Sequence, residues 1–121
     1  MLIVDDSHHA RELYAMYLDH VGFSVRVVAD GHAAVDAAVN MRPDVIVMDL
    51  AMPGLDGLAA TQLIRRHRRI RDTPVILLTG YPHAAIERGA LESGVDVFLT
   101  KPCLPEDLET HVRGLMESKR R

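Results

Sequence analysis

The chain has 121 residues, of which 48% are hydrophobic and 26% charged, and its formal net charge is −3. This length suits one globular domain with its own core, and so small a charge gives no argument for a nucleic-acid or membrane partner. The single cysteine excludes an internal disulfide and favours a reducing compartment. No apolar run approaches the ~20 residues of a membrane-spanning helix, and no signal-peptide pattern opens the chain. We therefore expect one cytoplasmic domain over residues 1–121.

Short apolar runs recur along the chain and predict strands. They cover residues 2–4, 24–29, 44–49, 74–79 and 95–100. In the third run, Val45 to Met48 show no polar alternation, which indicates a strand covered on both faces, as in the middle of a parallel sheet.

Helical patterns separate these runs. The expected helices run from Ser7 to Gly22, then over 30–41, 56–66 and 82–93, and finally from Pro105 onward. Ser7, Asp30 and Asp56 are suited to cap the first three. Five strands alternating with five helices through short connections predict a doubly wound α/β domain with a parallel sheet.

Periodicity also predicts which helical side chains are buried. In the first helix the apolar spacing of i, i+3, i+4 and i+7 selects Ala10, Leu13, Tyr14, Tyr17 and Val21. The third helix is expected to bury Leu58, Leu63 and Ile64.

Polar residues follow the ends of several expected strands. Asp5 and Asp6 follow the first, Asp49 ends the third, Thr79 ends the fourth and Lys101 follows the fifth. The carboxyl ends of parallel strands share one edge of the sheet, where α/β domains bind ligands. The sequence therefore predicts one site made of these five residues.

The residue types at this edge favour phosphoryl chemistry. Carboxylates crowded together repel one another, and all-oxygen ligation with open water positions suits Mg²⁺. Lys101 and Thr79 add an ammonium group and a hydroxyl group that can stabilise phosphoryl oxygens. Asp49, at the centre of the group, is the natural nucleophile.

Taken together, these motifs resemble response-regulator receiver domains of two-component signalling. The matching segments are Val4-Asp5-Asp6-Ser7, Asp49 with the following Met52 to Gly57, Leu78-Thr79-Gly80, and Phe98-Leu99-Thr100-Lys101-Pro102. The resemblance covers essentially the whole chain. It implies a flavodoxin-like fold of five parallel strands in the order 2-1-3-4-5, with helices on both faces.

The resemblance also implies a role for each site residue. Asp49 would accept a phosphoryl group from a phosphohistidine on a sensor histidine kinase or a histidine phosphotransfer protein. Asp6 and Asp49 would bind Mg²⁺ directly and Asp5 through water, and the backbone carbonyl of Ala51 would complete the protein ligands. Lys101 would pair with Asp49 or its phosphoryl group, and the peptide bond between Lys101 and Pro102 would be cis.

A conformational switch is implied as well. Thr79 would move toward the phosphoryl group and Phe98 would rotate inward, changing the face built from the helix 82–93, the strand 95–100 and the last helix. That face could mediate a homodimer on phosphorylation. The domain would catalyse only its own phosphoryl transfer and autodephosphorylation.

Several residues depart from the commonest family pattern. Ala51 has no polar side chain to position a hydrolytic water, and Tyr81 is bulky near the same approach path, which favours a long-lived phosphoryl group. Phe98 lacks the hydroxyl of a tyrosine. Cys103 stands where many relatives carry an aromatic residue, and we expect it to be a small packed residue.

Other functions fit the residues less well. A phosphohydrolase of the haloacid dehalogenase type would need an acid where Ala51 stands. A nucleotide- or flavin-binding module would need a glycine-rich phosphate loop where Asp5 and Asp6 stand. A degenerate receiver that acts only as an interaction module is disfavoured because all five site residues are present.

Two further groups of residues are expected to lie at the surface of the protein. The basic run Arg65–Arg71 is predicted to lie in solvent at a helix end and its loop, without direct nucleic-acid binding. His8 and His9 are expected at exposed helix positions.

Overall fold

The computed structural model describes residues 1–81 and 83–120, so Arg121 and Pro82, the expected start of the fourth helix, lie outside the described residues. The strands are β1 (Leu2–Val4), β2 (Arg26–Val28), β3 (Ile46–Asp49), β4 (Val75–Thr79) and β5 (Val97–Thr100). The helices are α1 (His8–His20), α2 (Gly31–Met41), α3 (Gly57–Arg66), α4 (Ala84–Glu92) and α5 (Pro105–Arg120). The expected elements are therefore present, although the strands after β1 begin up to two residues later than predicted.

The strands form one sheet in the order β2-β1-β3-β4-β5, and every neighbouring pair is parallel. This confirms the doubly wound fold with the 2-1-3-4-5 order. β3 lies in the middle, between β1 and β4, as its uninterrupted apolar sequence predicted. β2 is an edge strand, and its Arg26 and Val27 are exposed.

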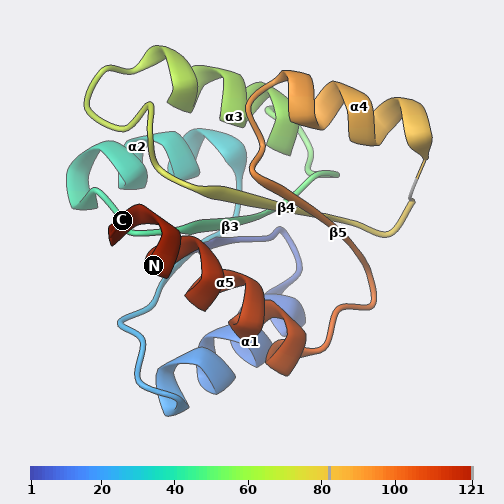
Figure 1. Cartoon of the computed structure of the whole chain (residues 1–121). Coiled ribbons are helices and arrows are strands. Elements are labelled where there is room, and N and C mark those ends of the chain that lie inside the picture. The colour runs from blue at the N-terminus through green and yellow to red at the C-terminus, as the bar shows by residue number, and fades with distance from the viewer. Residues whose placement is uncertain (82, 121) are drawn as a thin grey trace.

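Helices cover both faces of the sheet, with α1 and α5 on one side and α2, α3 and α4 on the other (Figure 1). Each face has its own apolar cluster. Leu2, Met48 and Ile64 belong to the cluster under α2, α3 and α4, and Ile3 and Leu18 to the cluster under α1 and α5. Alternate residues of one strand thus enter opposite clusters, which explains why the central strands are apolar throughout.

The predicted helix caps are confirmed. Ser7, Asp30 and Asp56 each stand at an N-cap position, and each side chain accepts a hydrogen bond from a backbone N–H in the first turn of its helix. The caps fix where α1, α2 and α3 begin. Of these helices, α1 and α3 follow β1 and β3, the strands whose ends carry acidic residues.

The prediction of burial is wrong for two helical residues. Leu13 is 48% exposed and Leu63 is 39% exposed, whereas Leu18, which was not among the residues predicted to be buried, is fully buried. The inward face of α1 is centred on Tyr14 and Leu18, one turn apart, and Leu13 lies ~100° around the helix from Tyr14. Leu63 is displaced in the same way from the buried Ile64.

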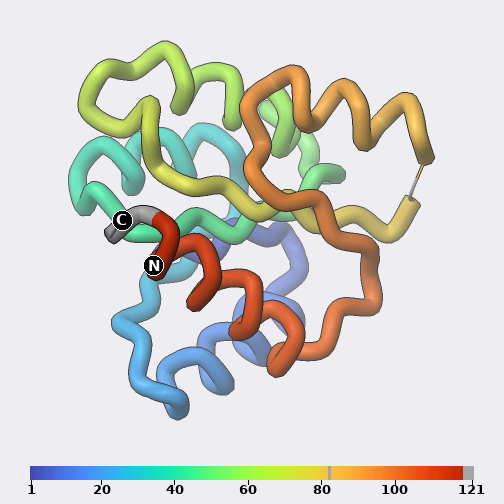
Figure 2. The backbone as a smooth tube through the Cα atoms, viewed as in Figure 1, coloured from blue at the N-terminus to red at the C-terminus, as the bar shows by residue number. Residues whose placement is uncertain are grey.

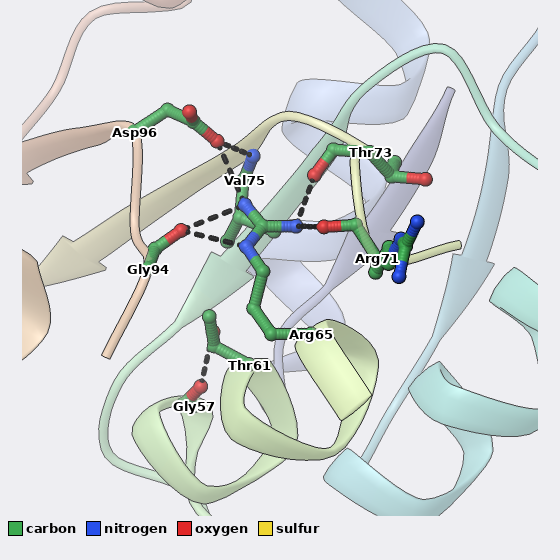
Figure 3. A network of polar contacts seen from close by, with 8 residues as sticks. All are labelled: Gly57, Thr61, Arg65, Arg71, Thr73, Val75, Gly94 and Asp96. Atoms are coloured by element: carbon green, nitrogen blue, oxygen red, sulfur yellow. Dashed lines mark hydrogen bonds and ion pairs between the residues drawn. The ribbon is translucent and has the colours of Figure 1, made fainter. Parts of the chain in front are cut away.

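The carboxyl end of α3 is held by one side chain, that of Arg65 (Figure 3). Its guanidinium group donates to the carbonyl oxygen of Gly94 at 2.7 and 2.9 Å and to that of Thr73 at 2.6 Å. It also donates to the carbonyl of Arg71 at 3.0 Å and contacts the carboxylate of Asp96 at 2.9 Å. One side chain thereby joins α3 to the loops that precede β4 and β5.

The expectation that the whole basic run lies in solvent is therefore wrong for Arg65. The expectation is confirmed for the other four arginines of the run, because Arg66, Arg68, Arg69 and Arg71 are exposed, whereas Ile70 within the run is buried. Among the described residues, no helix combines the length and the apolar character needed to cross a membrane.

Candidate functional site

The predicted site residues meet at the carboxyl edge of the sheet. Val4 of β1 lies opposite Met48 of β3, so the residues that follow them, Asp5 and Asp49, are neighbours across the two strands. Thr79 ends β4 opposite Thr100 of β5. The next residue, Lys101, donates its backbone N–H to the carbonyl of Thr79 at 2.7 Å.

Three carboxylates converge at this edge. Asp5, Asp6 and Asp49 each place one oxygen so that all three lie within 4.8 Å of one another. Asp5 and Asp49 are only 2% and 6% exposed, whereas Asp6 faces solvent. The cluster is therefore a half-open group of oxygen ligands that solvent can reach from the side of Asp6.

Lys101 lies between the two buried carboxylates. Its Nζ is 3.1 Å from Oδ2 of Asp5 and 3.2 Å from Oδ1 of Asp49. Oδ1 of Asp5 accepts the backbone N–H of Ser7 at 2.9 Å. Both carboxylate oxygens of Asp5 are thus engaged within the protein, and Asp6 and Asp49 have more capacity for an incoming ligand.

The electrostatics of the site follow from three acids and one base. Burial raises the pKa of Asp49, and repulsion from Asp5 and Asp6 adds to this effect, while Lys101 opposes it without cancelling it. Burial acts to lower the pKa of Lys101, but its hydrogen bonds to both carboxylates and their attraction raise it. The site carries surplus negative charge, which favours a cation beside the carboxylates.

The other predicted residues surround this group. Thr79 is buried, and its hydroxyl oxygen accepts the backbone N–H of Tyr81 at 3.1 Å, while the Tyr81 side chain is 79% exposed. Phe98 is half-buried against the cluster under α2, α3 and α4. Ala51 is exposed just after Asp49, and the peptide bond between Lys101 and Pro102 is cis, as predicted.

Some residues that support the site were not predicted. Arg11 donates to the carbonyl oxygen of Asp5 at 2.8 Å, and Tyr14 donates its hydroxyl to the carbonyl oxygen of Cys103 at 2.8 Å. Gly57 packs on the strand end itself, where an added Cβ would lie 2.5 Å from the carbonyl oxygen of Asp49. Gly57 stood in a recognised motif, but the side-chain types of Arg11 and Tyr14 gave no signal of contacts to backbone carbonyls.

Comparison with known proteins identifies the family. Residues 1–113 match the model of the response regulator receiver domain. The chain belongs to this family and is a receiver domain of two-component signalling. The relatives that it matches include regulatory proteins.

Individual relatives support this assignment. The DNA-binding dual master transcriptional regulator RpaA of Synechocystis is 34% identical over 116 residues, which is 96% of this chain and 48% of that protein. The chain spans about half the length of the curated relatives it matches.

Solved structures agree in fold. The signal receiver domain of a signal transduction histidine kinase from Syntrophus aciditrophicus is 36% identical with a TM-score of 0.90, covering 99% of this chain and 91% of that one. A second similar structure is the receiver domain of a sensor histidine kinase from Pseudomonas aeruginosa, which has a magnesium ion coordinated in its active site cleft. It is 32% identical with a TM-score of 0.88, and the match covers 96% of this chain and 95% of that one.

Proposed function

We propose that Asp49 accepts a phosphoryl group from a phosphohistidine on a sensor histidine kinase or a histidine phosphotransfer protein, with Mg²⁺ as cofactor. The observation that carries the proposal is the position of Lys101 between Asp5 and Asp49, beside three carboxylates whose oxygens lie within 4.8 Å. Of these carboxylates, Asp49 is at the centre of the sheet and in contact with the ammonium group.

The ligand set fits a magnesium ion. All available donors are oxygens, and no histidine or cysteine among the described residues joins the cluster. Asp6 and Asp49 would bind the ion directly, the backbone carbonyl of Ala51 would add a third ligand, and Asp5, whose oxygens are already engaged, would act through water. When bound, the ion supplies positive charge to the phosphoryl oxygens. The magnesium ion in the related receiver from Pseudomonas aeruginosa supports this assignment.

The proposed transfer forms one bond to phosphorus and breaks another. An oxygen of the Asp49 carboxylate attacks phosphorus, and the phosphorus–nitrogen bond of the donor breaks with its electron pair left on the imidazole. A proton on the second ring nitrogen lets the donor leave as neutral imidazole. Lys101 would stabilise the charge of the phosphoryl oxygens, and the Thr79 hydroxyl would donate to one of them once Thr79 has moved toward the group.

Phosphorylation would then change a surface. Thr79 moves toward the phosphoryl group, and Phe98 rotates inward, which alters the face formed by α4, β5 and α5. This face would mediate signalling to partners and a possible homodimer. We propose that residues 1–121 form one cytoplasmic receiver domain, which catalyses only its own phosphorylation and autodephosphorylation and does not bind nucleic acid directly.

The phosphoryl group is expected to be long-lived. Ala51 gives a hydrolytic water no side-chain partner, and the bulky, exposed Tyr81, two residues beyond Thr79, would hinder the approach of that water. Replacement of Ala51 by Asn or Glu should change the dephosphorylation rate, measured by intact mass after removal of the donor. Equal rates in the three proteins would contradict this role of Ala51.

The direct test is phosphorylation by a small donor. Intact-mass measurement after incubation with acetyl phosphate and Mg²⁺ should show one added phosphoryl group, which a chelator prevents. Asp49→Asn should abolish uptake. The matched control is Asp56→Asn, a nearby exposed aspartate whose capping role asparagine preserves, and this variant should be phosphorylated normally.

Two outcomes would overturn the proposal. The unaltered protein could fail to take up a phosphoryl group from a competent donor, which would favour a receiver that acts as an interaction module without phosphorylation. Alternatively, uptake could persist in Asp49→Asn, which would place the acceptor elsewhere.

A further inference from the structure

One face of α1 carries two side chains that donate to backbone carbonyls at the site. Arg11 donates to the carbonyl oxygen of Asp5 at 2.8 Å, and Tyr14, three residues later on the same face, donates its hydroxyl to that of Cys103 at 2.8 Å. Tyr14 is 6% exposed, so its hydroxyl is fixed inside the fold.

The two carbonyls lie on either side of one ion pair. Asp5 belongs to the segment after β1, and Cys103 belongs to the segment after β5, two residues beyond Lys101. The side chains of Asp5 and Lys101 meet at 3.1 Å. The backbone trace shows the segment after β5 passing to the side of the sheet where α1 lies (Figure 2). A single rigid helix therefore holds the backbone at both ends of the Lys101–Asp5 pair.

Such an arrangement matters because Lys101 is a flexible residue. A lysine ammonium group is a point charge on a four-carbon stem, so its position depends on where the backbone is held. A tyrosine, with two side-chain torsions, is a rigid spacer between its helix and its hydrogen-bond acceptor. A small misplacement of a catalytic group can cost a large factor in rate.

The same helix supplies a comparison within the chain. Tyr17, one turn beyond Tyr14, donates its hydroxyl at 2.7 Å to the carboxylate of Glu109 on α5. That contact joins α1 to α5 without touching the site. Tyr14 and Tyr17 thus offer two similar hydrogen bonds from α1, of which one ends beside Lys101 and the other does not.

We propose that α1 is a brace for the Lys101–Asp5 pair, with Tyr14 and Arg11 as positioning residues for phosphoryl uptake at Asp49. The inference rests on the proposed function. Neither residue touches the phosphoryl group. Each acts through the backbone that carries a catalytic side chain.

The experiment compares Tyr14→Phe with Tyr17→Phe. Each variant loses one hydroxyl and keeps its ring, and Arg11→Met serves as a second test because it removes the donors and keeps the side-chain length. The first readout is the initial rate of phosphoryl uptake from acetyl phosphate at saturating Mg²⁺, followed by intact mass. The second is the NMR chemical shift of the Lys101 side chain without donor, in protein with carbon-13 lysine. The chain contains two lysines, and the resonance that persists in Lys119→Arg belongs to Lys101.

Tyr14→Phe is expected to slow uptake by about fivefold and to shift the Lys101 resonance. Arg11→Met should act in the same direction, and Tyr17→Phe should leave both readouts as in the unaltered protein. The proposal is overturned if the Lys101 resonance is unmoved in Tyr14→Phe, if it moves while the rate does not, or if Tyr17→Phe gives the same changes. If the unaltered protein takes up no phosphoryl group, the proposed function fails, and an unmoved resonance would still overturn the brace on its own.

Discussion

At the scale of single residues, the site is short of positive charge. Lys101 contacts two carboxylates, and Asp6 adds a third nearby. An ionised Asp49 is consequently disfavoured by burial and by its acidic neighbours, as its raised pKa shows. The residue that carries the proposed chemistry is thus held at a cost to the stability of the fold.

Asp49→Asn is predicted to be more stable than the unaltered protein at neutral pH without divalent cations. A carboxyl group whose pKa is raised in the folded state contributes stability at low pH, and this contribution is lost as the pH rises through that pKa. Asparagine does not ionise, so the variant does not lose stability in this way. Urea unfolding measured between about pH 4 and pH 7 should show that the difference in unfolding free energy between Asp49→Asn and the unaltered protein becomes smaller as the pH falls. Asp36→Asn, at an exposed position of α2, is the control, and an Asp49→Asn protein that is less stable at pH 7 would contradict the prediction.

Gly57→Ala is predicted to disturb the strand end that bears Asp49. The added Cβ would meet the carbonyl oxygen of Asp49 at 2.5 Å and Cδ1 of Leu77 at 2.7 Å, so β3 and α3 must move apart. The expected loss is about 2 kcal/mol of unfolding free energy, measured with urea. Gly89→Ala is the matched control, because nothing lies within 4 Å of its added Cβ inside α4 and alanine should stabilise the helix by about 1 kcal/mol. Equal effects of the two substitutions would contradict the argument.

At the scale of elements, periodicity predicted where helices lie better than which way they face. Ser7, Asp30 and Asp56 marked helix starts because a capping side chain acts locally on its own first turn. Leu13 and Leu63 were misplaced because each neighbours a truly buried residue, and only the packing of the helix on the sheet decides between them. Arg65 was misjudged for a similar reason, since its acceptors come from loops distant in sequence.

Arg65→Lys is predicted to loosen the end of α3 and the loop that precedes β5. One ammonium group cannot replace a planar guanidinium that reaches Gly94, Thr73 and Asp96 together (Figure 3). We expect a loss of about 1–2 kcal/mol in unfolding free energy and faster amide hydrogen exchange over residues 93–97. Arg66→Lys, at the exposed neighbouring position, should change neither quantity. Unchanged exchange in Arg65→Lys would show that the network is not needed there.

At the scale of the whole molecule, the site was predictable because parallel strands end at one edge. Once β1, β3, β4 and β5 were recognised, Asp5, Asp49, Thr79 and Lys101 had to lie together whatever the details of packing. The supporting contacts of Arg11, Tyr14 and Gly57 were not predictable in this way. They depend on how closely α1 and α3 approach the sheet, and the acceptors are backbone atoms that every residue possesses.

Mg²⁺ is predicted to stabilise the folded chain through the same group of carboxylates. A ligand that binds only the folded state adds ~2.7 kcal/mol at 100 times its dissociation constant. Thermal unfolding with increasing Mg²⁺ should show this gain, and Asp6→Asn should remove most of it because Asp6 is the exposed member of the cluster. Asp72→Asn, an exposed acid outside the cluster, should keep the full gain. The same gain in Asp6→Asn as in the unaltered protein would contradict this ligand set.

The tyrosine contacts of α1 have a practical consequence. The chain has three tyrosines and no tryptophan, and fluorine incorporated into the tyrosine rings would give a spectrum of three lines. Tyr14 would report on the segment after Lys101, Tyr17 on the seam between α1 and α5, and Tyr81 on the open surface beside Thr79. The hydrogen bond to Glu109 raises the pKa of Tyr17 to about 12, and burial raises the pKa of Tyr14 as well, so the lines are assigned from Tyr14→Phe and Tyr17→Phe, each of which removes one of them. One spectrum would then follow three parts of the molecule while it is switched on and off.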